Sequence, residues 1–369
     1  MLIKYFTVTD NQKDYTDYNY TTSFNTDIFP FLKLIRRIPE NVYFAKLEFI
    51  HQLYDYGDYL REIIPQSDDP DFKMTKLPNG KCTANLISLG NVYSLLDPAT
   101  YEKFGLNPAK NHKLCAYCAL YGNFERLKWA VAIGCKVDEL TCAYAAKSGN
   151  LEILKWLRDI GCEWDYLTCT YAAARGYLDI LKWAREAGCE WNHSTCTDAA
   201  KNGFLDVVKW ARSNGCDWNK WTCAAAAQSG NLDILKWLKD NGCEWNYMTC
   251  ATAAKNGHLK MLKWARENGC EWNSKTCAAA ALSGNLEILQ WARSNGCEWD
   301  HLVCEYASKN NYSQMLDWAI NNGAPYNNSK IEIPTKSNMP LKNIIEADQF
   351  ISFVQNTMGL DLSRVIQIR

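Results

Sequence analysis

The chain has 369 residues, with 40 basic and 41 acidic side chains and a formal net charge of −1. With 47% hydrophobic and 22% charged residues, this composition is typical of a soluble globular protein of two or three domains and excludes a disordered charged tail protein. The balanced charge removes the main electrostatic term for nonspecific nucleic-acid binding, and no apolar run approaches the about 18 residues of a membrane span. The first residues lack the apolar core of a signal peptide, so we expect an intracellular protein.

Residues 1–97 contain no tryptophan but are rich in other aromatic side chains. Short segments with alternating apolar residues predict strands, at 3–9, 41–47, 59–64 and 81–89. The apolar spacing over 47–57 predicts a helix between two of these strands. We therefore expect a small α/β domain over residues 1–97, followed by a capping helix within 98–112, with the segment 65–81 as an exposed loop.

From residue 115 onward the sequence repeats with a constant step of 27 in residue number. All 15 tryptophans lie in this region, and all but Trp221 fall into two series that begin at Trp129 and Trp164. All cysteines except Cys82 and Cys118 form two series with the same step, which begin at Cys115 and Cys135. A constant period of this length is typical of a stacked solenoid, and the stretch from 115 to 330 holds eight such units.

Each unit predicts a helix, a turn and a second helix. In the unit TCAYAAKSGNLEILKWLRDIGCEWDYL, which starts at residue 141, small apolar residues at positions i, i+3 and i+4 precede Gly149 and predict a short first helix. Asn150 is suited to cap the second helix, and Gly161 is suited to the left-handed conformation that ends it. Because one unit cannot cover both of its flanks, we expect stacking to bury a dry seam of indoles, aliphatic side chains and thiols.

From its alanine pair onward, the unit resembles the ankyrin repeat. The pattern AA-xx-G-x-LEI-L…GCEWD of residues 145–165 is similar to the family pattern AA-xx-G-x-LEIV…GADVN, with the same internal spacing. Two features differ, because the step is shorter than the period of about 33 residues in the family and the family's TPLH start is replaced by T-C-x-x. The resemblance implies a mainly α, ankyrin-like solenoid of about eight repeats, in which the projecting β-hairpin finger of the family is reduced to a tight loop.

Such short units rich in tryptophan and cysteine are similar to ankyrin proteins of giant viruses that infect amoebae. Residues 1–97 resemble a module that precedes the repeats in those viral proteins. The resemblance implies a viral protein that acts in the host cytoplasm and binds a host or viral protein.

The end of the repeat region departs from the pattern. Asn311 replaces the first glycine of the last unit, and Ala324 and Pro325 replace its cysteine and acidic residue. Terminal repeats need a more polar outer face, so we interpret this unit as a cap. We expect the solenoid to span residues 98–330 and residues 331–369 to form a linker and a helical tail.

No pattern in the sequence predicts a catalytic, cofactor or metal site. Cys115 and Cys118 have the spacing of a zinc half-site once, without a second half-site, so we interpret the cysteines as small buried core residues. Disulfides along one series are excluded, because successive layers lie about 8–10 Å apart and bridged Cα atoms must lie within about 7 Å. The usual phosphate, zinc-protease and acyl-transfer strings are absent. An enzymatic alternative concerns the N-terminal domain, because residues 41–64 are similar to a strand and helix of ADP-ribosyltransferases, although the histidine and glutamate of that family have no counterparts here.

We expect a non-catalytic interaction scaffold whose protein partner binds where the units differ and remain exposed. Aromatic and arginine side chains are the usual anchors of such contacts. The candidates on the first helices are Tyr144, Tyr171, Arg175, Asp198, Lys201 and Lys255, and those in the short loops are Tyr166, Lys220, Trp221, Tyr247 and Lys275. Trp221 is the leading candidate because it belongs to neither tryptophan series, and packing against Trp218 is its structural alternative. We expect a monomer that binds neither nucleic acid nor a membrane.

Overall fold

The computed structural model describes residues 5–9, 36–37, 43–77 and 79–326. The chain divides into two compact units, Met1–Thr222 and Cys223–Arg369, and helix α10 (Lys220–Ser229) spans the division. The predicted linker and helical tail at 331–369 lie outside the described residues.

The N-terminal part of the first unit is a seven-stranded sheet with the order β2-β7-β4-β1-β3-β6-β5, and all of its paired strands are antiparallel. The aromatic and β-branched residues favour strands here, and Phe44, Ile63 and Ile87 are buried in one cluster on the sheet. The 3-10 helix η2 (Leu47–Tyr56) follows β3, where the sequence predicts a helix. The strands are β1 (Tyr5–Thr9), β2 (Arg36–Arg37), β3 (Phe44–Lys46), β4 (Tyr59–Pro65), β5 (Met74–Lys76), β6 (Lys81–Ala84) and β7 (Leu86–Ser94).

Two predictions for this region need correction. The segment predicted as an exposed loop at 65–81 contains β5, which pairs with β6. The strand predicted at 81–89 is interrupted at Asn85, whose side chain accepts a hydrogen bond from the Lys73 amide at 2.7 Å and donates one to the Asp71 carbonyl at 2.7 Å. These bonds tie Asn85 to the preceding loop, so that β6 and β7 form two separate strands.

After the sheet, helix α1 (Pro98–Phe104) and the 3-10 helix η3 (Pro108–Lys110) lead into a series of helix pairs. The first helix of a pair begins after an Asp or Asn that caps it, as Asp165 does by accepting a hydrogen bond from the Leu167 amide at 2.9 Å. The pairs are α2 (Leu114–Leu120) with α3 (Phe124–Ala132), α4 (Glu139–Ser148) with α5 (Leu151–Asp159), α6 (Tyr166–Ala174) with α7 (Leu178–Glu186), α8 (His193–Lys201) with α9 (Leu205–Ser213), α10 with α11 (Leu232–Asp240), α12 (Tyr247–Lys255) with α13 (Leu259–Glu267), α14 (Ser274–Leu282) with α15 (Leu286–Ser294), and α16 (Leu302–Lys309) with α17 (Ser313–Asn321).

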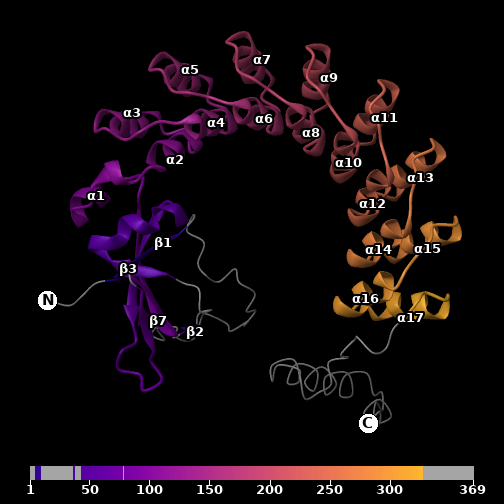
Figure 1. The fold of residues 1–369 in the computed structure, drawn as a ribbon, viewed down its shortest axis with the longest axis horizontal. Helices are drawn as coiled ribbons and strands as arrows, with labels where there is room; N and C mark the ends of the chain where they lie inside the picture. The colour runs from indigo at the N-terminus through magenta and orange to yellow at the C-terminus, as the bar shows by residue number, and fades with distance from the viewer. Residues whose placement is uncertain (1–4, 10–35, 38–42, 78, 327–369) are drawn as a thin grey trace, which may run out of the picture. The chain divides into compact units, whose positions relative to one another are not determined.

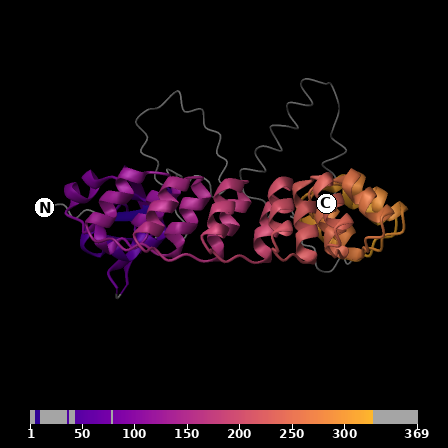
Figure 2. The ribbon, with the colours of Figure 1, turned by 90° about the horizontal axis from the view of Figure 1, so that it is seen from above.

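Within each unit, the first helices of successive pairs pack against one another. In the first unit α4 contacts α2 and α6, and α6 contacts α8, whereas in the second unit α14 contacts α12 and α16. In each unit taken by itself, Figure 1 shows the first helices in one row and the second helices in another, and Figure 2 shows the helices of the first unit from above, standing side by side. The connection from α5 to α6 contains no strand, as expected for a shortened finger. The mainly helical repeat fold and the small N-terminal sheet are therefore confirmed.

The fully buried part of each pair, which we call the seam, consists of small and aliphatic side chains. In the first unit its members include Cys142, Ala145, Ala146, Ile153, Leu154, Leu157, Cys169, Ala172, Ala173, Leu181 and Ala184, each with 0% exposure. Alanine and cysteine allow the first helices to approach closely, while the second helices contribute the larger aliphatic groups. The stack therefore has a dry interior, as the repeat pattern predicts.

The prediction that the indoles lie in this dry interior is wrong. The tryptophans of both series are half-buried and form what we call the indole edge. In the first unit, Trp164 in the loop after α5 meets Trp183 of α7 edge-to-face, with ring centroids 5.7 Å apart, and the guanidinium carbon of Arg158 lies 4.3 Å from the Trp164 ring centroid. The aliphatic residues occupy the centre of the inward face of each second helix, so the tryptophan lies at the margin of that face.

Candidate protein-binding surface

A row of tyrosines lies on the first helices of the first unit. Tyr117, Tyr144 and Tyr171 occupy equivalent positions of successive repeats, on α2, α4 and α6. All three are half-buried, and the rings of Tyr144 and Tyr171 stack with centroids 6.1 Å apart and planes 22° apart. We call these three residues the tyrosine ladder. It presents aromatic surface on the side of the first helices that the seam leaves uncovered.

Lys147 joins the two stacked rings of the ladder. Its ammonium nitrogen lies 5.4 Å from the ring centroid of Tyr144 and 5.2 Å from that of Tyr171, within the range of a cation–π interaction. Tyr144 and Tyr171 were predicted as binding residues, whereas Tyr117 and Lys147 were missed. Tyr117 could have been found from the sequence, because it precedes Tyr144 by one period.

Three first helices of this unit, α4, α6 and α8, carry a cation at their C-terminal ends. Lys147 and Lys201 lie in the last turns of α4 and α8, and Arg175 is the residue that ends α6. Arg175 and Lys201 are exposed. Cations at this end complement the helix dipole, and they also give this rim of the surface a positive charge that an acidic ligand could meet.

Several candidates predicted in loops lie instead at the starts of first helices. Trp221 is the second residue of α10, and its backbone amide donates a hydrogen bond to the Asn219 side chain at 2.9 Å. The loops end sooner than predicted because the Asp or Asn at the end of each connection already caps the helix. Trp221 is 50% exposed and Tyr166 is 40% exposed, so both present aromatic area to solvent. The helix starts concerned are those that hold Tyr166, Lys220, Trp221, Tyr247 and Lys275.

The remaining candidates are spread over two first helices of the second unit. Tyr247 and Lys255 are the first and last residues of α12, and Lys275 lies in the first turn of α14. Tyr247 is half-buried, and both lysines are exposed. The structure thus brings Tyr144 and Tyr171 into direct contact, while Lys255 lies at the far end of α12 from Tyr247.

Asp198 follows Tyr171 by one period and lies half-buried on α8. Burial raises the pKa of its carboxyl above the usual 3.8, and the nearby Lys201 acts in the opposite direction. This position therefore changes from an aromatic to an acidic residue along the same row of helices.

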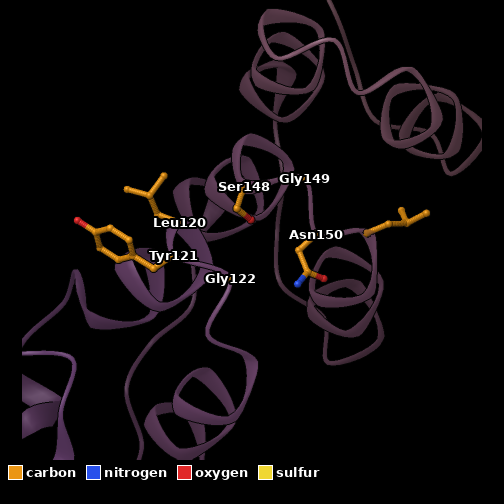
Figure 3. A pocket seen from close by; sticks show the side chains of 7 residues that line it. Leu120, Tyr121, Gly122, Ser148, Gly149 and Asn150 are labelled. Atoms are coloured by element: carbon orange, nitrogen blue, oxygen red, sulfur yellow. The ribbon is translucent and has the colours of Figure 1, made fainter.

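A cavity of about 430 Å³ opens between the turns of the first two helix pairs (Figure 3). We call it the turn notch. Tyr121, which ends α2, lies on one side of it, and Asn150, which caps α5, lies on the other. The Tyr121 hydroxyl bonds to the carboxylate of Asp58 in the N-terminal part of this unit, and burial together with this bond raises the pKa of Tyr121. The residues that line the notch are Leu120, Tyr121, Gly122, Ser148, Gly149, Asn150 and Leu151.

The cysteines form pairs that the sequence reasoning missed. From Cys115 to Cys277, the first-helix cysteine of each helix pair hydrogen-bonds with the cysteine that follows the second helix of that pair. Cys142 bonds in this way with Cys162, and this bond together with burial raises the pKa of the Cys142 thiol. The Cys162 thiol also donates to the backbone carbonyl of Asp138 at 3.2 Å. The raised pKa keeps the Cys142 thiol protonated, and a protonated thiol is a poor nucleophile and a poor metal ligand. Among the residues that the structure describes, no cluster of three or more Cys, His, Asp or Glu side chains could hold a metal ion.

The helices between residues 98 and 326 are short, and the described part of the chain contains none that is long and apolar enough to cross a membrane.

Comparison with protein families matches residues 169–249 and 196–276 to a model of ankyrin repeats in three copies. Comparison with individual proteins finds relatives in Acanthamoeba polyphaga mimivirus that are named for ankyrin repeats. R838 is 40% identical over 72 residues, R868 is 34% identical over 95 residues and R896 is 36% identical over 104 residues. These matches cover 18%, 25% and 27% of the chain and span 25%, 47% and 31% of the respective relatives, so the chain spans less than half of each of the three.

Proposed function

Because the chain carries ankyrin repeats similar to those of mimivirus proteins, we propose that it is a non-catalytic scaffold that binds a protein partner through its first-helix surface. The predicted binding residues Tyr144, Tyr171, Arg175, Asp198 and Lys201 lie on this surface in the first unit. The residues Tyr166, Lys220 and Trp221 extend it to the starts of these helices, and Tyr247, Lys255 and Lys275 belong to the corresponding surface of the second unit.

The observation that carries the proposal is the tyrosine ladder with Lys147. The seam of every repeat is built from the same few residue types, so these tyrosines are not needed to stack one helix pair on the next. Their rings are half-buried and already ordered by stacking and by the lysine. Rigid aromatic side chains bind with a low entropic cost and are frequent anchors of protein interfaces.

The charge on the rim indicates the chemistry of the partner. Lys147, Arg175 and Lys201 lie at the same ends of their helices, and the exposed cations would attract acidic side chains. We therefore expect the partner to present a segment that combines aromatic with acidic residues. Its binding should weaken as the salt concentration rises, because exposed charges are screened.

The relatives in a giant virus support a viral origin and a role in the host cell. On this basis we propose that the chain acts as a monomer in the host cytoplasm and binds a host or viral protein.

The test uses the full chain as bait in extracts of amoebae infected with a giant virus, with bound proteins quantified by mass spectrometry. The double variant Tyr144→Ala/Tyr171→Ala should lose a partner that the wild-type chain retains, while its unfolding midpoint stays within a few degrees. The matched control Lys182→Ala/Lys209→Ala changes exposed or half-buried residues of the second helices and should retain the partner. Equal retention by the double variant, or equal loss in the control, would contradict the proposal.

The alternative function, a nucleotide-using enzyme in residues 1–97, rests only on the resemblance of residues 41–64. Calorimetric titration of the full chain with NAD⁺ distinguishes the two functions. Saturable binding that remains in the Tyr144→Ala/Tyr171→Ala variant would favour the enzyme, whereas the scaffold requires no nucleotide.

A further inference from the structure

The residue that follows the turn glycine of each helix pair, or Asn311 in the last pair, belongs to one of two classes. In chain order these residues are Asn123, Asn150, Tyr177, Phe204, Asn231, His258, Asn285 and Tyr312. Each lies directly before the second helix of its pair, so the same backbone position holds either an asparagine or an aromatic ring.

The asparagines act as helix caps. The Asn150 side chain accepts a hydrogen bond from the Ile153 amide at 2.9 Å, and Asn285 accepts one from the Ile288 amide at 3.0 Å. By contrast, α7, α9, α13 and α17, which follow the aromatic residues, have no side-chain cap. An N-cap stabilises a helix by about 1 kcal/mol, so the aromatic residues must serve another purpose.

The aromatic rings cover the glycine turn of the preceding pair. A Cβ atom placed on Gly149 would lie 2.7 Å from the Tyr177 ring, and one on Gly176 would lie 2.6 Å from the Phe204 ring. In the second unit, the same construction on Gly284 meets the Tyr312 ring at 2.7 Å. A side chain is therefore excluded at these glycines for two reasons, because their backbone is left-handed and because a ring lies where a Cβ atom would be.

The turn of the first pair lacks such a ring. A Cβ atom on Gly122 would find only the Asn150 amide nitrogen, at 3.9 Å. Gly122 corresponds to Gly149 and Gly176 in the following repeats, and Asn150 corresponds to Tyr177 and Phe204. The turn notch is lined by both Gly122 and Asn150, and so it lies where the next two turns hold an aromatic ring from the chain itself.

We propose that the turn notch binds an aromatic side chain, tyrosine or phenylalanine, supplied by the protein partner. The ring takes the place over Gly122 that Tyr177 takes over Gly149 and Phe204 takes over Gly176. This inference rests on the proposed function for the source of the ring, whereas the site itself is a property of the folded turn.

The surroundings of the notch agree with this ligand. Its volume of about 430 Å³ accommodates a phenol ring together with the backbone that carries it. The Ser148 hydroxyl donates to the Ala145 carbonyl at 2.9 Å, and its oxygen remains able to accept a hydrogen bond from a phenol.

The turn at Gly257 is the natural comparison in the second unit, because an asparagine also occupies the equivalent position of the next repeat. There the Asn285 amide nitrogen would lie 3.3 Å from a Cβ atom on the glycine, closer than Asn150 lies at Gly122. We therefore expect the notch at Gly122 to be the stronger site.

The test uses N-acetyltyrosinamide and p-cresol as probes of the full-length protein, observed by NMR at the backbone amides of glycines. In the wild-type protein, the amide signals of Gly122 and Gly149 should shift saturably at probe concentrations on the order of millimolar. N-acetylalaninamide, which has no ring, should leave these signals unchanged at the same concentration.

Two variants exchange the classes of residue. Asn150→Tyr should place a ring over Gly122 and reduce the response of Gly122 to the probes at least about tenfold. Phe204→Asn should open a corresponding notch and create a response at Gly176 that the wild-type protein lacks. If Asn150→Tyr does not fold, Asn150→His replaces it, because His258 covers Gly230 in the second unit in the same way.

Weak shifts spread over many residues and unchanged by Asn150→Tyr would overturn the proposal, as would a folded Phe204→Asn variant without a response at Gly176. Failure of the notch proposal can be distinguished from failure of the proposed function. Probe binding in the notch together with unchanged partner capture by Tyr144→Ala/Tyr171→Ala contradicts only the role of the ladder. Loss of partner capture in that variant together with no probe binding contradicts only the notch.

Discussion

The seam and the indole edge recur with the same period but differ in how far they exclude water. In the pair α6/α7, Cys169 and Leu181 are fully buried, whereas Trp183 keeps part of its ring exposed and rests against Trp164. Periodicity shows that a position has the same environment in every repeat, but it does not show how deep that environment is. Tryptophan, the largest apolar residue of the repeats, lies at the margin of the core. The centre of the core is built from alanine, cysteine and leucine.

The strongest test of this difference is the substitution Leu181→Ala in the seam. Because the side chain is fully buried and its loss leaves a cavity, we expect the free energy of unfolding to fall by about 2–5 kcal/mol. Urea unfolding followed by far-UV circular dichroism measures the change. The control Leu178→Ala, at a half-buried position of the same helix, should cost clearly less, and equal losses would remove the distinction between the centre and the margin of the core.

A second comparison uses two glycines that have similar backbone conformations. Gly176 and Gly188 have φ values of 76° and 85°, so an alanine at either position costs about 1 kcal/mol in backbone strain. At Gly176 the new methyl group also meets the Phe204 ring, whereas at Gly188 it meets open space. We expect Gly176→Ala to cost about 2 kcal/mol and Gly188→Ala about 1 kcal/mol in the same urea assay. If the ring contact is real, the double variant Gly176→Ala/Phe204→Ala should lose less stability than the sum of the losses of the two single variants. A loss in the double variant equal to that sum would argue against the contact.

Truncation of a tryptophan in the indole edge should lower the free energy of unfolding by less than the size of the side chain implies. Trp183→Ala removes a larger side chain than Leu181→Ala, but part of the indole is already in water, so we expect a loss of about 1–2 kcal/mol. Trp183→Phe keeps an aromatic partner for Trp164 and should lose less than half of that. A loss for Trp183→Ala that exceeds the loss for Leu181→Ala would show that the indoles belong to the core after all.

The smallest expected effect concerns a charge beside the seam. Burial raises the folded-state pKa of Asp198 above 3.8, so folding favours its protonated form. The resulting stability is complete below the unfolded pKa and is lost as the pH rises through the folded pKa. At pH 7, Asp198→Asn should therefore be more stable than the wild-type protein by a few tenths of a kcal/mol, since the group is only partly buried. The difference should vanish well below the unfolded pKa of about 4, and unfolding curves at about pH 3 and pH 7 check the sign.

Much of this fold could be predicted from the sequence because each repeat has the same kinds of capping and turn residues at the same positions. Asn150 and Gly161 mark the start and the end of a second helix by their capping chemistry, and both act as predicted. The strand break at Asn85 could not be predicted, because it depends on hydrogen bonds to the backbone of Asp71 and Lys73 in the preceding loop.

The binding surface was predicted in part. Tyr144 and Tyr171 could be selected because they vary among equivalent positions, but their stacking and the bridging role of Lys147 depend on the distance between neighbouring helices. The starts of the first helices were misplaced because the capping role of Asn219 and its equivalents was not applied to the loop that contains them. The turn notch arises from a residue of one repeat and a glycine of the preceding one, so no single unit contains the signal.

The thiol of the second cysteine in a repeat donates to a backbone carbonyl at the end of the preceding repeat, just before its own first helix, as Cys162 does to Asp138 and Cys189 does to Asp165, each at 3.2 Å. In the second unit the Cys270 thiol makes the same bond to Asn246 at 3.4 Å. Excision or duplication of one whole repeat would recreate this link at the new junction, with an equivalent donor and acceptor. Recombination between repeats could thus lengthen or shorten such an array in a single genetic event, and the aromatic or asparagine turn carried by each segment would move with it.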